Sequence, residues 1–403
     1  MVIRILAIGD VANNSEVLRK YLKKSSVHIV QFPNKYSKIQ ILGKNEEFFD
    51  SLNIFESVRK INKIKDRFDL CFVTSWAGAR IAFLADLNYI IFFVGTDIQA
   101  PPFVKKPEPN NLMLSSFNHN FLERFFYKKV LDSAIACVAG DPSLYAALIK
   151  YRKDAVRIDR IFVDYEIFNP DIKPIERKKT KFTFFSPQRF VYFKGMDLIF
   201  KAISLCKSEF EILQVEWFDD PSQEGNEIMK DLLKNIPPQV KFLPVIKRDE
   251  VAKYYTFADA VLGQMRSGSP GGVEREAALC KKPVIHYYNL NSTYLLDGIY
   301  VTAPFVPNSN EPEQIAKTID MIVQSKEFRD KIAKDEYEFV RNLTDPEKTA
   351  YDWDNFFETC YKKYKSIKKN SFFLANQFNK ILFTLGYISH WRIIKKKIFR
   401  TAY

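Results

Sequence analysis

Residues 184–197 read Phe-Phe-Ser-Pro-Gln-Arg-Phe-Val-Tyr-Phe-Lys-Gly-Met-Asp, and they contain the strongest structural signal in the sequence. It predicts a strand, then a loop that presents Arg189 and Lys194, then a helix that starts at Gly195. Ligands of open α/β sheets bind at the carboxyl ends of strands, where a helix N-terminus offers unpaired N–H groups. The fork of an arginine and the point charge of a lysine suit a pyrophosphate at such a place. Taken alone, the same residues also fit a solvated basic loop.

Residues 264–285 form a second motif, which follows a predicted strand at 260–263. Its glycine-rich turn contains Gly271 and Gly272 and leads into a helix that carries Glu276. Small residues let backbone amides approach a ligand, and a carboxylate one turn into a helix can accept hydrogen bonds from ribose hydroxyls. The other interpretation of this motif is a tight turn followed by a solvent-facing glutamate.

Around these motifs, short apolar runs alternate with amphipathic ones, as is typical of parallel α/β sheets. A polar segment with two prolines, 169–180, separates two such series and indicates a domain boundary. We therefore predict domains at 1–172 and 173–345, followed by C-terminal helices at 346–403. In the first domain, Asp141 suits a helix N-cap and Pro142 the first helical position. The predicted strands are 3–8, 69–74, 89–94, 135–139, 181–186, 211–215, 240–243, 260–263 and 284–286.

The composition fits a globular protein, because 47% of the 403 residues are hydrophobic and 27% are charged. The five cysteines form no C-x-x-C pair, which argues against a zinc or redox motif and favours a reducing compartment. No apolar run reaches the roughly 18–20 residues that span a bilayer. From these features we expect a cytoplasmic protein.

The net charge of +13 is concentrated in the tail, because residues 361–403 contain 11 Lys and Arg and no acidic residue. Apolar residues recur there with the 3–4 spacing of an amphipathic helix, which Gly386 interrupts. We predict that residues 367–403 bind an anionic membrane surface, at the inner face of the membrane, although part of this stripe could pack back on the first domain. No nucleic-acid-binding module is recognisable outside the tail, so nucleic acid is not an expected partner. The stripe consists of Leu374, Phe378, Ile381, Leu385, Ile388, Trp391, Ile394 and Ile398.

The two motifs together resemble the retaining GT-B glycosyltransferases that use nucleotide sugars, glycosyltransferase group 1 or family 4-like. The resemblance covers 186 to about 361 well and the first domain more loosely. It rests on Arg189, five residues on Lys194-Gly195, and on Glu276-Ala277 followed by Pro283-Val284-Ile285. Further matches are Phe242-Leu243, Ala258-Asp259, the trailing helices at 305–339, Gly95-Thr96-Asp97 and 161–168.

This resemblance implies a GT-B fold, with two Rossmann-like domains that face each other across a cleft. It implies that Arg189 and Lys194 hold the diphosphate and stabilise charge on the departing nucleotide. Glu276 would hold the ribose, backbone around Val245 would contact the base, and Gly9 would lie near the diphosphate. No metal and no cofactor are expected, because the nucleotide sugar is a substrate and the two cations replace a metal.

On the acceptor side we predict Asp97 and His119, although a surface histidine is the other interpretation of His119. The chain departs from the family at Gly268, where a glutamate usually contacts the donor sugar, and at Val94, where a histidine is common. The function implied is transfer of a sugar from a nucleotide-sugar donor to a glycan or lipid-linked acceptor, with retention of configuration. The alternative is a catalytically inactive scaffold that binds a nucleotide or sugar.

Overall fold

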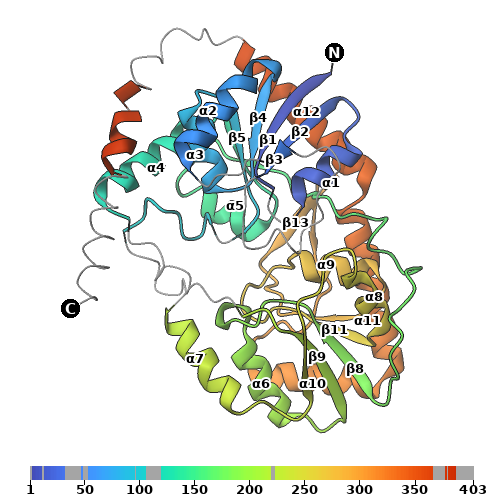
Figure 1. Cartoon of the computed structure of the whole chain (residues 1–403). Coiled ribbons are helices and arrows are strands. Elements are labelled where there is room, and N and C mark those ends of the chain that lie inside the picture. The colour runs from blue at the N-terminus through green and yellow to red at the C-terminus, as the bar shows by residue number, and fades with distance from the viewer. Residues whose placement is uncertain are drawn as a thin grey trace, which may run out of the picture.

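The structure is a computed structural model, and it describes residues 2–10, 13–31, 47–48, 53–95, 97–105, 119–218, 223–365, 377–378 and 380–386. Two parallel sheets with helices around them lie one above the other in Figure 1. The predicted α/β architecture is therefore confirmed.

The first domain contains a seven-stranded parallel sheet in the order β3-β2-β1-β4-β5-β6-β7. Strands β1, β4, β5 and β6 are almost entirely buried, because helices cover both faces of the sheet. The strands are β1 (Ile3–Ile8), β2 (Ser25–Gln31), β3 (Glu47–Phe48), β4 (Leu70–Val73), β5 (Tyr89–Phe93), β6 (Ala136–Ala139) and β7 (Val156–Arg157). The helices are α1 (Asn14–Tyr21), α2 (Ile54–Ile64), α3 (Trp76–Leu84), α4 (Phe121–Ser133) and α5 (Pro142–Leu148).

The second domain contains a five-stranded parallel sheet in the order β10-β9-β8-β11-β12. The chain order reverses between β8 and β11, so this is the point at which an open sheet binds its ligand. The strands are β8 (Phe182–Ser186), β9 (Phe210–Val215), β10 (Val240–Leu243), β11 (Ala260–Leu262) and β12 (Val284–Ile285). The helices are α6 (Met196–Leu205), α7 (Gln223–Lys234), α8 (Val251–Phe257), α9 (Gly272–Leu279), α10 (Pro312–Gln324) and α11 (Lys326–Leu343).

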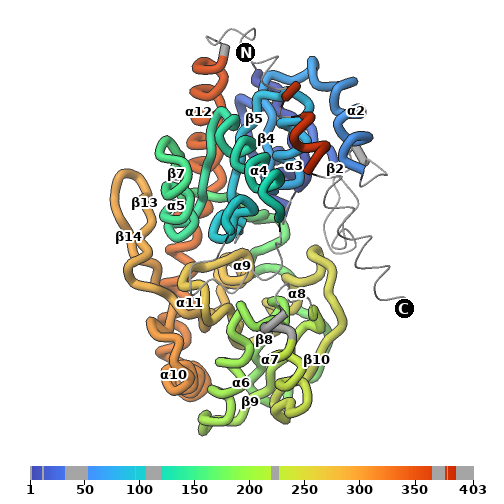
Figure 2. The backbone as a smooth tube through the Cα atoms, turned by 90° about the vertical axis from the view of Figure 1, so that its left-hand side faces the viewer, coloured from blue at the N-terminus to red at the C-terminus, as the bar shows by residue number. Residues whose placement is uncertain are grey.

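An antiparallel hairpin of β13 (Thr293–Leu296) and β14 (Ile299–Thr302) extends from the second domain to the first. Figure 2 shows it beside β7 and α5. Arg157 donates to the carbonyl oxygen of Thr293, and the Leu295 N–H donates to Asp159 Oδ2 over 2.5 Å. The hairpin therefore ties the two domains together at one side of the cleft.

Helix α12 (Pro346–Lys365) returns from the second domain and packs on the first, where Figure 1 shows it beside β2. Trp353 and Phe357 are buried in the core of the first domain and make edge-on ring contacts with Phe72 at 5.7 Å. The Trp353 Nε1–H donates to the Arg160 carbonyl oxygen over 3.1 Å. The predicted helical C-terminal region is thus confirmed, and α12 within it packs on the first domain.

Most of the predicted membrane-binding tail, 367–403, lies outside the described residues. A helical segment at 380–386 packs on the first domain through Phe383, whose ring lies 4.5 Å from that of Phe126 in α4 (Figure 1, red). The described members of the predicted apolar stripe, Phe378, Ile381 and Leu385, are instead 62%, 58% and 54% exposed. Within the described part of the tail, Phe383, which packs back on the first domain, is therefore not one of the stripe.

None of the helices in the described ranges is long and apolar enough to cross a bilayer.

Candidate functional site

The loop after β8 is fixed by a glycine that no other residue could replace without strain. A 3-10 turn, Tyr192–Lys194, leads to Gly195, whose φ of 81° lies in the left-handed region. A Cβ at Gly195 would lie 2.8 Å from Cβ of Met265, which is too close for any side chain. This close approach lets the Met265 N–H donate to the Lys194 carbonyl oxygen over 2.9 Å. The two predicted motifs are thus joined, and α6 begins directly after Gly195.

The second loop, between β11 and α9, is organised by the buried carboxylate of Glu274. It accepts hydrogen bonds from the backbone N–H of Gln264 at 2.9 Å and of Gly271 at 2.7 Å. Burial opposes ionisation of Glu274, but His286, Lys194 and the Gln264 amide outweigh it, and the pKa of the carboxyl is lowered. Glu274 therefore holds the glycine-rich turn in place at the start of α9.

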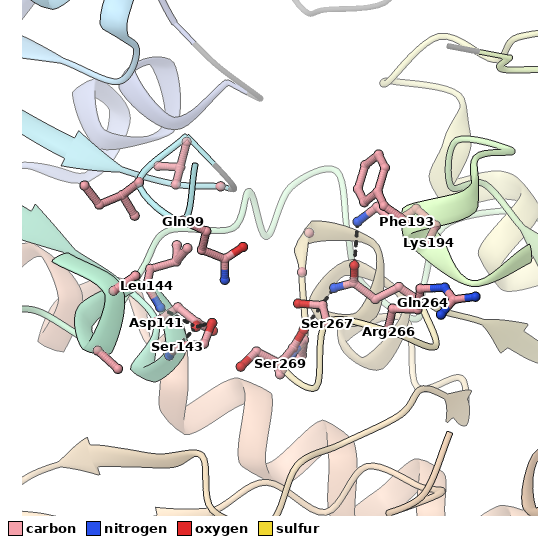
Figure 3. Close-up of a pocket in the computed structure, with 18 of the residues that line it drawn as sticks. Gln99, Asp141, Ser143, Leu144, Phe193, Lys194, Gln264, Arg266, Ser267 and Ser269 are labelled. Atoms are coloured by element: carbon pink, nitrogen blue, oxygen red, sulfur yellow. Dashed lines mark hydrogen bonds between the residues drawn. The ribbon is translucent and has the colours of Figure 1, made fainter. Parts of the chain in front are cut away.

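A cavity of about 690 Å³ lies between the two domains. In Figure 3 its two walls face each other, with Gln99, Asp141 and Ser143 of the first domain opposite Lys194 and Gln264 of the second. A neighbouring cavity of about 340 Å³ is lined by residues of both motifs. Those that line both cavities include Arg189, Lys194, Gly271, Gly272 and Arg275.

Arg189 and Lys194 are thus brought together in the cleft. The Lys194 Nζ donates to Oε1 of Gln264 over 2.6 Å (Figure 3). Burial, with the neighbouring charge of Arg189, lowers the pKa of Lys194 to about 8, while Glu274 opposes the shift. The Arg189 guanidinium lies 4.9 Å from the ring centroid of Phe193 and forms no ion pair with a carboxylate in the described part of the chain. This wall therefore offers two cations to an anionic ligand.

Glu276 lines the smaller cavity from α9, and its side chain is buried. It forms an ion pair with Arg248 and accepts a hydrogen bond from the Tyr255 hydroxyl at 3.2 Å. Burial raises the pKa of Glu276, and Arg248 opposes that rise. Arg248 also lines the smaller cavity. The sequence analysis did not identify it, because its partner lies 28 residues further along the chain.

The other predicted nucleotide contacts, Gly9 and Val245, are not among the residues that line the two cavities. Gly9 follows β1 and has a φ of 73°. Asn14, the first residue of α1, lines the smaller cavity in its place. Val245 lies in the loop after β10 and is 46% exposed. Two residues that follow neighbouring strands line the smaller cavity instead. They are Trp217, after β9, and Arg248, in the loop after β10.

The predicted acceptor-side residues, Asp97 and His119, are not among the residues that line either cavity. Asp97 lies in the loop after β5, between Gly95 and Gln99, which do line the larger one. Burial raises the pKa of its carboxyl to about 7. His119 lies at the start of α4, with its ring 5.0 Å from that of Tyr127. Asp141, expected only as the N-cap of α5, accepts from the Ser143 N–H at 2.8 Å and also lines both cavities.

The two departures from the family also lie in the cleft region. Val94 lines both cavities. Gly268 has a φ of 66°, and a Cβ there would lie 3.0 Å from Cβ of Asn289. A glutamate at position 268 would therefore be strained in this loop. Across the described ranges, no three His, Cys, Asp or Glu side chains are grouped so that they could hold a metal ion.

Residues 168–339 match the model of the family described as glycosyl transferases group 1. No curated protein matches the sequence. The similar solved structures include Anabaena Alr3699/HepE in complex with UDP and glucose, which is 14% identical over 89% of this chain and 100% of that one, with a TM-score of 0.62. They include sucrose-phosphate synthase (tll1590) from Thermosynechococcus elongatus, at 16% identity, 90% and 100% coverage and a TM-score of 0.63. A glycosyltransferase from Rickettsia africae is 17% identical over 91% of this chain and 99% of its own, with a TM-score of 0.57.

These likenesses confirm the predicted fold. The three structures share the overall fold of this chain over about nine-tenths of its length. The chain therefore has the GT-B fold, and its second domain matches the family of glycosyl transferases group 1.

Proposed function

We propose that this chain transfers a sugar from a nucleotide-sugar donor to a glycan or lipid-linked acceptor, with retention of configuration. The observation that carries the proposal is the meeting of Arg189, Lys194 and the N-terminus of α9 in one interdomain cleft. All three belong to the segment that matches the glycosyl transferases group 1 family. Similar structures in complex with UDP and with UDP-glucose support a nucleotide-sugar donor.

The proposed chemistry follows from the charges in the cleft. The bond between the anomeric carbon and the diphosphate oxygen breaks, and negative charge develops on the departing nucleotide. A bond forms between the same carbon and the oxygen of an acceptor hydroxyl, whose proton passes to the departing diphosphate. Arg189 and Lys194 stabilise that charge, because fixed cations interact strongly with developing negative charge in a site from which water is excluded. A metal ion is not needed for this step, because two cations already face the diphosphate. Glu276 accepts hydrogen bonds from the ribose, and the acceptor enters from the wall formed by the first domain.

The proposal is tested with full-length protein and a panel of nucleotide sugars, by calorimetry for binding and by nucleotide release for turnover. Arg189→Ala and Lys194→Ala should each weaken donor binding by about 1.5–3 kcal/mol, the range for hydrogen bonds to charged groups. Unchanged affinity in both variants would show that the nucleotide binds elsewhere. Proton NMR of the anomeric centre of the product reports retention or inversion.

The second candidate function is a scaffold that binds the nucleotide sugar without turnover. It is motivated by Gly268, which supplies no side chain where the family has a sugar-binding glutamate. Tight binding of a donor, with no nucleotide release in the presence of any acceptor in a broad glycan panel, would favour this function over transfer.

We also propose that the chain is cytoplasmic and that residues 367–403 hold it at the inner face of the membrane. The exposed side chains of Phe378, Ile381 and Leu385 support this, as do the Lys and Arg residues of the tail. The test is co-sedimentation with vesicles that contain phosphatidylglycerol. Ile381→Glu with Leu385→Glu should lower the bound fraction, and neutral vesicles should bind the natural protein weakly. Equal binding to both kinds of vesicle would contradict the proposal.

A further inference from the structure

Arg275 is a buried cation in the cleft to which the proposed donor chemistry gives no role. It lies in the first turns of α9, it is only 9% exposed, and it lines both cavities. Its Nε has no hydrogen-bond partner, and its guanidinium forms no ion pair with a carboxylate, among the residues that the structure describes. The Arg275 side chain contacts the hydroxyl of Tyr294, which in turn donates to Asp141 at 3.3 Å. Burial of a guanidinium with an unsatisfied N–H donor destabilises the folded protein unless a ligand accepts a hydrogen bond from it.

The charges that line the larger cavity are unbalanced. Among the described residues that line it, Arg189, Lys194, Arg266 and Arg275 are cationic, Lys150 has an interaction of its own, and Asp141 is the one carboxylate. Arg266 is already paired with Asp197, at 2.5 Å. A bound diphosphate would pair with Arg189 and Lys194. Arg275 would still have no anion with which to pair.

The larger cavity, which Arg275 lines, contains a second unsatisfied donor. The hydroxyl of Ser269 is buried and has no hydrogen-bond partner within the described ranges, and Ser269 lines the larger cavity. Arg275 and Ser269 therefore both bring unsatisfied hydrogen-bond donors to the larger cavity, which suits an oxyanion better than a neutral hydroxyl cluster.

We propose that Arg275 binds a second anionic group, a carboxylate or a phosphate, carried either by the sugar of the donor or by the acceptor. The inference rests on the proposed function, because it assumes that Arg189 and Lys194 hold the diphosphate. It assigns the substrate class: one of the two sugars that meet in the cleft is acidic. The planar fork of arginine matches both oxyanions in a bidentate manner.

The experiment is calorimetry with full-length protein, and its two arms separate the two sources of the anion. UDP, GDP and ADP are titrated first to find the nucleotide. The donor arm then compares UDP-glucose with UDP-glucuronate, or GDP-mannose with GDP-mannuronate if GDP binds more tightly. The acceptor arm compares glucose with glucose 6-phosphate, both with and without saturating nucleoside diphosphate.

The natural protein should bind the acidic member of one pair at least about tenfold more tightly than the neutral member, as one charge-assisted contact allows. Arg275→Gln should remove this preference and leave the affinity for the nucleoside diphosphate within about twofold of the natural value. Arg275→Lys, which retains charge without the fork, should keep part of the preference. Arg266→Gln, the matched removal of one cavity charge, should keep it, as should Tyr294→Phe, which removes only the hydroxyl that Arg275 contacts.

Three results would overturn the proposal. The first is no preference for the acidic member in either arm. The second is an equal loss of nucleoside diphosphate affinity in Arg275→Gln, which would assign Arg275 to the diphosphate site. The third is loss of the preference in Arg266→Gln to the same extent, which would indicate a general positive field. Failure of every nucleotide to bind refutes the proposed function instead, and the glucose 6-phosphate titration without nucleotide still tests Arg275.

Discussion

Lys194 makes the affinity for a nucleotide sugar depend on pH. Its pKa in the free protein is lowered to about 8, chiefly by burial, so its proton is lost as the pH rises through this value. The diphosphate favours the charged form, and binding therefore requires the protonated fraction. That fraction falls from about 0.9 at pH 7 to about 0.1 at pH 9, which weakens the apparent affinity about tenfold. The diphosphate of a nucleotide sugar does not itself titrate in this range, and comparison with Lys194→Gln separates the titration of the lysine from that of the nucleotide base.

The assay is calorimetry with one nucleotide sugar at pH 7, 8 and 9, for the natural protein and for Lys194→Gln. The variant should bind about tenfold more weakly at pH 7 and should show no dependence on pH, because glutamine carries no proton to lose. The two proteins should converge near pH 9. Thermal unfolding at each pH serves as the control for folding. A flat profile for the natural protein, or the same decline in Lys194→Gln, would refute the assignment of Lys194 to the diphosphate.

Three further predictions concern the described side chains and turns. Gly195→Ala should destabilise the protein by about 2–4 kcal/mol in urea unfolding, through left-handed strain and a steric clash. Gly298→Ala has the same φ of 81° and nothing within 4 Å, so it should cost only about 1–2 kcal/mol, and an equal loss would contradict the clash. Glu276→Gln should weaken UDP binding about tenfold but leave inorganic pyrophosphate binding unchanged, since only the nucleotide has a ribose, and parallel losses would argue against that role. Phe383→Ala should remove about 3 kcal/mol of packing and speed proteolysis within 377–386, whereas Leu385→Ala, at an exposed position, should not.

The parts of the fold that could be predicted from the sequence are those with a local physical signal. Continuous apolar runs predicted β1, β4, β5 and β6, because strands covered on both faces contain few polar residues. Asp141 and Pro142 predicted the start of α5 from capping chemistry alone, and the N-cap hydrogen bond is observed. Strand β2 (Ser25–Gln31) was not predicted, because it includes Ser25, Ser26, His28 and Gln31 in a short run.

In the candidate site, too, the residues that could be predicted are those with a local signal in the sequence. Arg189 and Lys194 stand out because they follow a strand and precede a glycine, which is a signal within a few residues. Arg248 and Tyr255 could not be assigned to Glu276, because only the packing of α8 and α9 brings them together. Nor could the sequence indicate that Arg275 is buried without a carboxylate partner in the described ranges, since its surroundings include the hairpin and the other domain.

Because α12 returns to the first domain, the core of that domain cannot be fully packed until α12 has been synthesised. Trp353 and Phe357 fill the face of the first sheet around Phe72 and Phe92, yet they lie near the far end of the chain. Chains usually fold domain by domain from the N-terminus as they leave the ribosome. Here the first domain emerges with an apolar face that stays uncovered until α12 has been translated. Its final packing therefore waits until α12 has left the ribosome, and a nascent chain that stops before Pro346 presents this face to chaperones and to its neighbours.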